Sequence, residues 1–194
     1  FNYNGVNTWS QIGLTIPGEF AEDNSGLDLS LSANGEIVAI GARSNDGNGN
    51  RSGHVRVFQN ISGTWTQIGG DIDGEAAEDQ SSGGEGNAVS LSADGQIVAI
   101  GARYNDGNGN LISNAGHTRV YQYDVTKTTG ESDQTSPDYG PIGWRRLGQD
   151  IDGEASNDQS GIAVSLSSDG NIVAIGAYNV DSLDANGNLL NNTG

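Results

Sequence analysis

The chain has 194 residues, with 31 glycines, 3 prolines and no cysteine or methionine, and its formal charge is −17 from 25 acidic and 8 basic residues. This composition excludes disulfides and thiolate zinc sites, and it argues against a nucleic-acid partner because an acidic surface repels phosphate. No apolar run reaches the ~18 residues of a membrane-spanning helix. Only 34% of the residues are apolar, so we expect a core built from many short strands with small side chains.

Internal repeats organise the whole chain. A Trp-containing segment begins at Trp9, Trp65 and Trp144, and each copy is followed by an acidic loop, a Ser-Leu-Ser segment and Ile-Val-Ala-Ile-Gly-Ala. A Gly-His-x-Arg-Val segment then follows in the first two copies. The repeats cover residues 9–64, 65–143 and 144–194, and the last one is incomplete. A recurring unit of this length indicates a repeat architecture.

Each period contains four segments with strand character. The Ser-Leu-Ser segments alternate apolar and polar residues, which is typical of a strand with one buried face. The Ile-Val-Ala-Ile segments are apolar on both faces, as expected for a strand between two neighbouring layers. An Asn-Gly or Asp-Gly pair before each of them suits a tight hairpin. We therefore predict an all-β fold of β-propeller blades, each of four antiparallel strands, with about three blades in this chain.

The pattern resembles the FG-GAP family of propeller repeats, in its bacterial-type branch, and is distantly similar to the integrin α-subunit head. The resemblance is carried by the Trp-x-Gln start, by an Asp-x-Ser-Gly step at 23–26 and 158–161, and by the Val-Ala-Ile-Gly-Ala and Gly-His-Val-Arg-Val-Phe segments. It implies a propeller that serves adhesion, ligand binding or an enzyme's accessory domain. The family's calcium loop lies between the first two strands of a blade, where this chain has only a short turn such as 33–35. That metal site is therefore not carried over.

A different calcium site is predicted in the loops between the second and third strands. Each of these loops contains Asp-x-Asn-x-Asn, which places oxygen side chains at positions 1, 3 and 5, like the start of a calcium loop. An EF-hand is excluded, because its twelfth position would be Val57 or His117. A turn rich in Asn and Gly is the alternative interpretation. The candidate ligands are Asp46, Asn48, Asn50, Asp106, Asn108, Asn110, Asp184, Asn186 and Asn188.

The acidic loops that follow the Trp segments are expected at the same end of the blades, because the loops of an antiparallel meander alternate between its two ends. Their Asp pairs are secondary metal candidates, and their recurring Glu and Asp residues are interpreted as loop-holding groups. The two histidines occupy one repeat position and are expected to be structural. The Trp residues are expected to pack between blades. The secondary candidates are Asp71, Asp73, Asp150 and Asp152.

Two surface features complete the expectations. Sequons that allow glycosylation on a eukaryotic secretory route occur at Asn50, Asn60 and Asn191. The segment 126–141 is absent from the first repeat, and its polar composition predicts a solvated loop that can be shortened.

Function is expected at the level of a module. Three blades are fewer than the usual ~4–8 of a closed ring, so further blades are expected from a longer chain or from neighbouring copies. The leading hypothesis is a non-catalytic, extracellular or cell-surface adhesion or assembly module, stabilised by calcium, with a protein or glycan ligand on its acidic loop face. The alternatives are a carbohydrate-binding lectin, a structural subunit of a surface filament, and a polysaccharide-acting enzyme domain.

Overall fold

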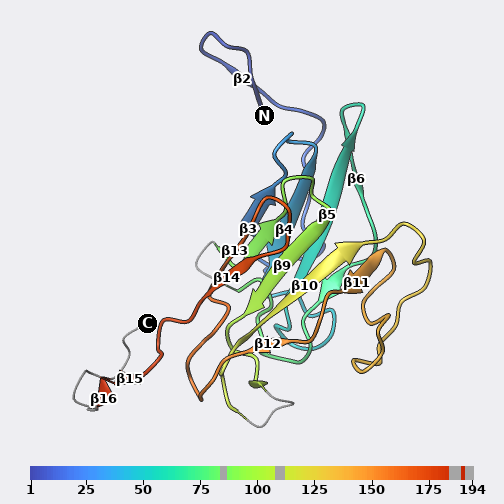
Figure 1. Ribbon diagram of the computed structural model, residues 1–194. Helices are drawn as coiled ribbons and strands as arrows, with labels where there is room; N and C mark the ends of the chain where they lie inside the picture. Colours follow the sequence, from blue (N-terminus) through green and yellow to red (C-terminus); the bar gives the residue numbers. More distant parts are fainter. Residues whose placement is uncertain (84–86, 108–111, 184–188, 191–194) are drawn as a thin grey trace.

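The computed structural model describes the chain except for residues 84–86, 108–111, 184–188 and 191–194, and its strands pair antiparallel (Figure 1). The all-β class is therefore confirmed. In chain order the strands are β1 (Asn2–Tyr3), β2 (Trp9–Ser10), β3 (Ser25–Leu31), β4 (Ile37–Ala42), β5 (His54–Ile61), β6 (Thr64–Gln67), β7 (Ile72–Asp73), β8 (Val89–Leu91), β9 (Ile97–Ala102), β10 (His117–Tyr123), β11 (Trp144–Arg146), β12 (Ile151–Asp152), β13 (Ala163–Leu166), β14 (Val173–Gly176), β15 (Ser182–Leu183) and β16 (Leu189–Leu190).

Two sheets share one topology. The first has the order β3-β4-β5-β6 and the second has the order β8-β9-β10-β11, so each is a four-stranded antiparallel meander. Short β7 and β12 add to the start of β5 and β10. The pair β13–β14 begins a third copy of the pattern, and β1–β2 forms a separate hairpin that projects from the body (Figure 1). Four antiparallel strands in order are thus present in these two sheets.

The turn between the first two strands of each sheet is built by its own sequence. The Ser32 hydroxyl accepts a hydrogen bond from the Ile37 amide at 2.9 Å, and the Asn34 side chain accepts one from the Glu36 amide at 3.0 Å. Gly35 has φ +75°, a left-handed conformation that glycine adopts without steric cost. Ser92 and Ser167 repeat the first bond at the turns before Ile97 and Ile172. The Ser-x-Asx-Gly sequence therefore sets each hairpin.

The sheets pack face to face through their first strands, β3 on β8 and β8 on β13. The Leu91 amide donates to the Ser30 hydroxyl at 2.8 Å, and the Leu166 amide donates to the Ser90 hydroxyl at 3.0 Å. One link therefore recurs at both sheet–sheet contacts. The main core fills the first contact and contains Ile37, Ala39, Val55, Val57, Ile68, Ile72, Val89, Leu91, Val98, Ile100, Tyr121 and Trp144.

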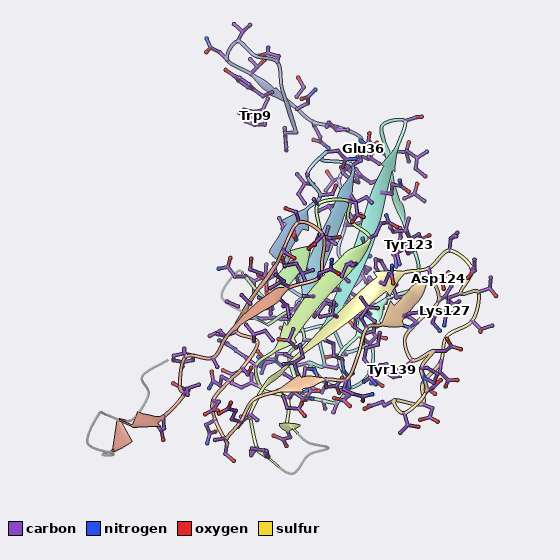
Figure 2. All side chains as sticks on the ribbon, viewed as in Figure 1. Trp9, Glu36, Tyr123, Asp124, Lys127 and Tyr139 are labelled. Atoms are coloured by element: carbon purple, nitrogen blue, oxygen red, sulfur yellow. The ribbon has the colours of Figure 1, made fainter. Side chains whose placement is uncertain are left out.

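The Trp residues behave as predicted where a neighbouring layer covers them. Trp144 is fully buried and its indole N–H donates to the Ile68 carbonyl at 3.2 Å. Trp65 repeats this bond to the Ile12 carbonyl at 3.0 Å. Trp9 is exposed on the projecting hairpin, away from the sheets (Figure 2). Sugar stacking on Trp144 is therefore excluded.

The segment 126–141 is mostly exposed, as expected for a solvated loop, and two of its side chains anchor it to the sheet. Lys127 is buried and donates to the Thr129 carbonyl. Tyr139 packs against the main core and accepts a hydrogen bond from Arg119 at 3.1 Å. Both residues lie on the segment beside β10 and β11 (Figure 2). Composition indicated the exposed character of the segment but not these two anchoring side chains.

Candidate functional site

The loops predicted to share one end of the sheets do meet. Asn48, in the β4–β5 loop, donates from its amide to the carbonyls of Gly74 and Glu75 at 2.9 and 2.8 Å. Gly74 and Glu75 belong to the acidic loop that follows β7. This end of the molecule, here called the loop end, carries all the candidate metal ligands that the structure describes.

The Asp-x-Asn-x-Asn side chains of the first loop have separate partners. Asp46 accepts the amide of Arg51 at 2.8 Å, while Asn50 donates to Glu78 at 2.5 Å. Each of the three side chains therefore has its own role in closing or bridging loops. Calcium at this motif stays a prediction, because nothing observed identifies an ion.

The second copy repeats the aspartate bond of this arrangement. Asp106 accepts the amide of Asn114 at 2.8 Å, as Asp46 accepts that of Arg51.

Asn60, a predicted glycosylation position, lies in the β5–β6 hairpin and accepts the Gly63 amide at 2.8 Å. The predicted positions that lie outside the described residues are Asn108, Asn110, Asp184, Asn186, Asn188 and Asn191.

The recurring acids hold loops, as predicted. Asp23 accepts the amide of Phe20, Asp79 that of Ala76 and Asp158 that of Ala155, at 2.9 to 3.1 Å. Asp23 and Asp79 also accept the side-chain amides of Asn45 and Asn105, each at 3.0 Å.

The structure also assembles two histidine–carboxylate clusters at repeat-equivalent positions. In each, a Glu from one acidic loop, a His from the start of a third strand and an Asp from the next acidic loop offer ligand atoms within 4.8 Å of one another. The sequence contained the signal, since all three residue types recur. Sequence reasoning missed the grouping because it paired residues within a loop and not across consecutive loops. The trios are Glu19, His54 and Asp71, and Glu75, His117 and Asp150.

The first cluster, which we define as Glu19, His54, Asp71 and Asp73, is spaced more loosely than a hydrogen-bond network. His54 Nδ1 lies 3.8 Å from Glu19 Oε2 and 3.9 Å from Asp73 Oδ1. Burial, with Asp71 and Glu19 nearby, raises the pKa of Asp73 to about 6. The guanidinium of Arg56, which neighbours this cluster, lies 3.8 Å from the Glu19 carboxylate. The carboxylates of this cluster are therefore under-compensated.

The second cluster, which we define as Glu75, His117, Asp150 and Arg119, is a tight ion-pair network. Arg119 reaches Asp150 with two hydrogen bonds of 2.8 and 2.7 Å and Glu75 at 2.8 Å. Burial, the largest single effect, would raise the pKa of Asp150, but the hydrogen bond from Arg119 and the nearby positive charges together lower that pKa. Burial, followed by the charge of Arg119, lowers the pKa of His117 to about 4. The imidazole is therefore neutral at pH 7.

A cleft of about 510 Å³ opens between the acidic loop around β7 (residues 71–75) and the segment 126–141. Carboxylates and two tyrosines line it, so it can accept hydrogen bonds from hydroxyl groups and attract cations. Its principal polar and aromatic lining residues are Asn48, Asp71, Asp73, Glu75, Glu131, Gln134, Tyr121 and Tyr139.

Comparisons of the chain with protein-family models, curated proteins and solved structures found no match. The described residues form no helix of the length and apolarity required to cross a membrane.

Proposed function

We propose that the chain is a run of β-propeller blades that acts as a non-catalytic adhesion or assembly module, and that its blades associate face to face with further blades. One observation carries this proposal: both outer faces of the sheet stack repeat the surfaces that are buried inside it. A location outside the cell belongs to the same proposal and rests on the resemblance to propeller repeats of surface proteins.

The leading face, defined as Leu29, Leu31 and Val38 on β3–β4, is exposed. Leu29 and Leu31 are 61% and 59% exposed. Their equivalents on the second sheet, Val89 and Leu91, are 5% and 7% exposed because the first sheet covers them. An apolar hollow of about 400 Å³ beside Leu31 and Val38 marks the same face. This supports a missing layer in front of β3.

The trailing face, defined as Ser165 on β13, Ile172 just before β14 and Ala174 on β14, is the surface that would contact a leading face. Ile172 is 70% exposed, whereas its equivalent Ile37 is 4% exposed. Ile37 packs so closely on Gly95 that a Cβ there would lie 2.8 Å from its side chain. Gly35, the equivalent glycine on the leading side, has open space around it. The free isoleucine and the free glycine support head-to-tail association, which generates rings or filaments.

Mass measurement on the 194-residue chain tests the proposal. Light scattering coupled to size exclusion should give a mass above the monomer that rises with concentration. Ile172→Asp and Leu29→Asp should each give a monomer, because a charge cannot be buried unpaired in an apolar contact. An equimolar mixture of the two variants should form dimers, because each variant retains one intact face.

Val125→Asp is the control, since Val125 is an exposed apolar residue outside both faces. It should associate like the wild type. A wild-type chain that remains monomeric at every concentration would overturn the proposal, as would loss of association in the Val125 variant alone.

A second candidate function, carbohydrate binding, is favoured by the cleft at the loop end. Carboxylates and the ring of Tyr139 line it, and this combination suits sugar hydroxyls and a sugar face. A glycan array read with the wild type and with Glu131→Gln tests this function. Binding that is unaffected by Glu131→Gln would place the sugar elsewhere.

A further inference from the structure

We propose that the first cluster binds one divalent transition-metal ion of the zinc or manganese kind. The proposal concerns the loop end of the first sheet and does not depend on association between blades. Its donors come from three segments that are distant in sequence: the loop before β3, the start of β5, and β7 with the residue before it.

The histidine of the cluster is buried and without a hydrogen-bond partner among the described residues. His54 Nε2 has none, and Nδ1 has only the two carboxylates beyond hydrogen-bond distance. Its side chain is 1% exposed. A buried imidazole that forms no hydrogen bond is costly, because Nε2 has lost water without a replacement. An ion between Nδ1 and the carboxylates would give this imidazole one bond, on the nitrogen that faces the acids.

The spacing of the donors fits a metal better than it fits hydrogen bonds. Hydrogen bonds to oxygen need about 2.7–3.2 Å, whereas Nδ1 lies 3.8 and 3.9 Å from Glu19 and Asp73. Tetrahedral ligands with bonds of about 2.0–2.1 Å stand about 3.4 Å apart. A contraction of about half an ångström would therefore bring Nδ1 and each of these two carboxylates to ligand spacing, and the Asp71 ligand atom lies within 4.8 Å of those of Glu19 and His54.

Charge and donor chemistry select the class of ion. Three carboxylates face one guanidinium in the first cluster, so a dication would neutralise the remaining charge. Calcium prefers oxygen donors in sixes to eights. A buried imidazole nitrogen with a few carboxylate oxygens is a donor set for zinc and related transition metals.

The second cluster is an internal control, because its guanidinium already occupies the place of a cation. Arg119 contacts Glu75 at 2.8 Å and Asp150 at 2.7 Å, while Arg56 stays 3.8 Å from Glu19. We therefore expect one ion per chain and not two.

Isothermal titration of EDTA-stripped protein with zinc chloride, manganese chloride and calcium chloride tests the proposal. It is done in the Ile172→Asp background, so that metal binding is measured whether or not the blades associate. In this background, the chain with both clusters unchanged should bind one zinc ion, and its melting temperature should rise when zinc is added. His54→Gln should weaken zinc binding by about tenfold or more, because a ligand is lost.

Asp73→Asn provides a second variant in case the buried substitution at His54 impairs folding, since the Asp73 side chain is half-exposed. It should weaken zinc binding similarly, while His117→Gln should leave it unchanged. Absence of zinc uptake would overturn the proposal. So would equal effects of His54→Gln and His117→Gln, or calcium binding that neither His54→Gln nor Asp73→Asn reduces.

Discussion

The two histidine–carboxylate clusters occupy the same place in consecutive repeats, yet they have opposite electrostatic states. Each has a buried histidine nitrogen without a hydrogen-bond partner, His54 Nε2 and His117 Nδ1, but only the first leaves its carboxylates loosely compensated. The second surrounds its carboxylates with two arginines, because Arg146 stands where the first repeat has Gln67 and donates to Asp150 at 2.8 Å. A single exchange on the last strand of the sheet therefore helps to convert an anionic site into a closed ion-pair network.

The segment 126–141 strengthens this difference. It brings Gln134 and Tyr139 within 3.3 and 3.1 Å of Arg119, and the first repeat has no equivalent. Two side chains at the same position of consecutive repeats can therefore have different charge environments. The charge balance of each cluster is set by residues outside the recurring Glu, His and Asp positions that define it.

The largest effect is expected from removing the guanidinium of the second cluster. Arg119→Met removes a buried guanidinium and leaves the partly buried Glu75 and Asp150 without their main counter-charge, and we expect a loss of about 3–5 kcal/mol in unfolding free energy. Arg56→Met, the matched change, should cost only about 1–2 kcal/mol, because Arg56 makes one short bond, to the Pro17 carbonyl. Urea denaturation measures both. Equal losses would show that the clusters do not differ.

Acid should weaken the fold through its histidines. The pKa of His117 falls from 6.5 to about 4 on folding. Between these pH values the unfolded chain binds a proton that the folded chain does not. The stabilisation is therefore complete above pH 6.5 and is lost as the pH falls toward 4. We expect a loss on the order of 1–2 kcal/mol between pH 7 and 5.

His117→Gln should reduce that loss, because glutamine does not titrate in this range. Denaturation curves at pH 7 and 5 for the wild type and the variant make the measurement. A pH dependence that is identical in the two proteins would assign the titration to other groups.

A smaller effect is expected from the segment that is present only in the second repeat. Tyr139→Phe keeps the ring on the core but removes the hydroxyl that accepts from Arg119. We expect a loss of about 1 kcal/mol, since the lost bond involves a charged donor but is partly replaced by solvent. Thermal denaturation at pH 7 measures it. If the variant matches the wild type, the segment supports the cluster by packing alone.

The smallest effects are expected at Asp46 and Asp106. Asp46→Ala and Asp106→Ala each remove one acceptor of a loop amide, and should cost about 0.5–1 kcal/mol. If calcium binds these loops, the melting temperature of the wild type will rise with calcium and that of the variants will rise less. If EDTA and calcium give the same melting temperature, these loops are turns and nothing more.

Strand order and hairpin turns were accessible from the sequence, because they depend on local signals. Alternation, the Ile-Val-Ala-Ile runs and the Ser-x-Asx-Gly turns all act within a few residues, and each recurs, so one copy checks another. The position of Trp144 between layers was accessible for the same reason. These features are repeated in the chain and need no knowledge of distant contacts.

The site could be predicted only in part. Asp71, Asp73 and Asp150 were recognised as acids at the loop end, but their grouping with His54 or His117 depends on how consecutive sheets stack. The packing of Tyr139 was missed because a polar segment around it suggested solvent. The grouping of the acids with the histidines and the packing of Tyr139 both depend on long-range contacts, which composition and spacing do not encode.

The link between the Ser30 hydroxyl and the Leu91 amide, repeated by Ser90 and Leu166, has an evolutionary consequence. Every junction uses the same donor and acceptor positions, so duplicating or deleting one period leaves no junction mismatched. A gene that encodes such units can change their number by unequal recombination without first evolving a new contact. Innovation is then confined to the segments that differ between units, and the insertion at 126–141 is already one of them.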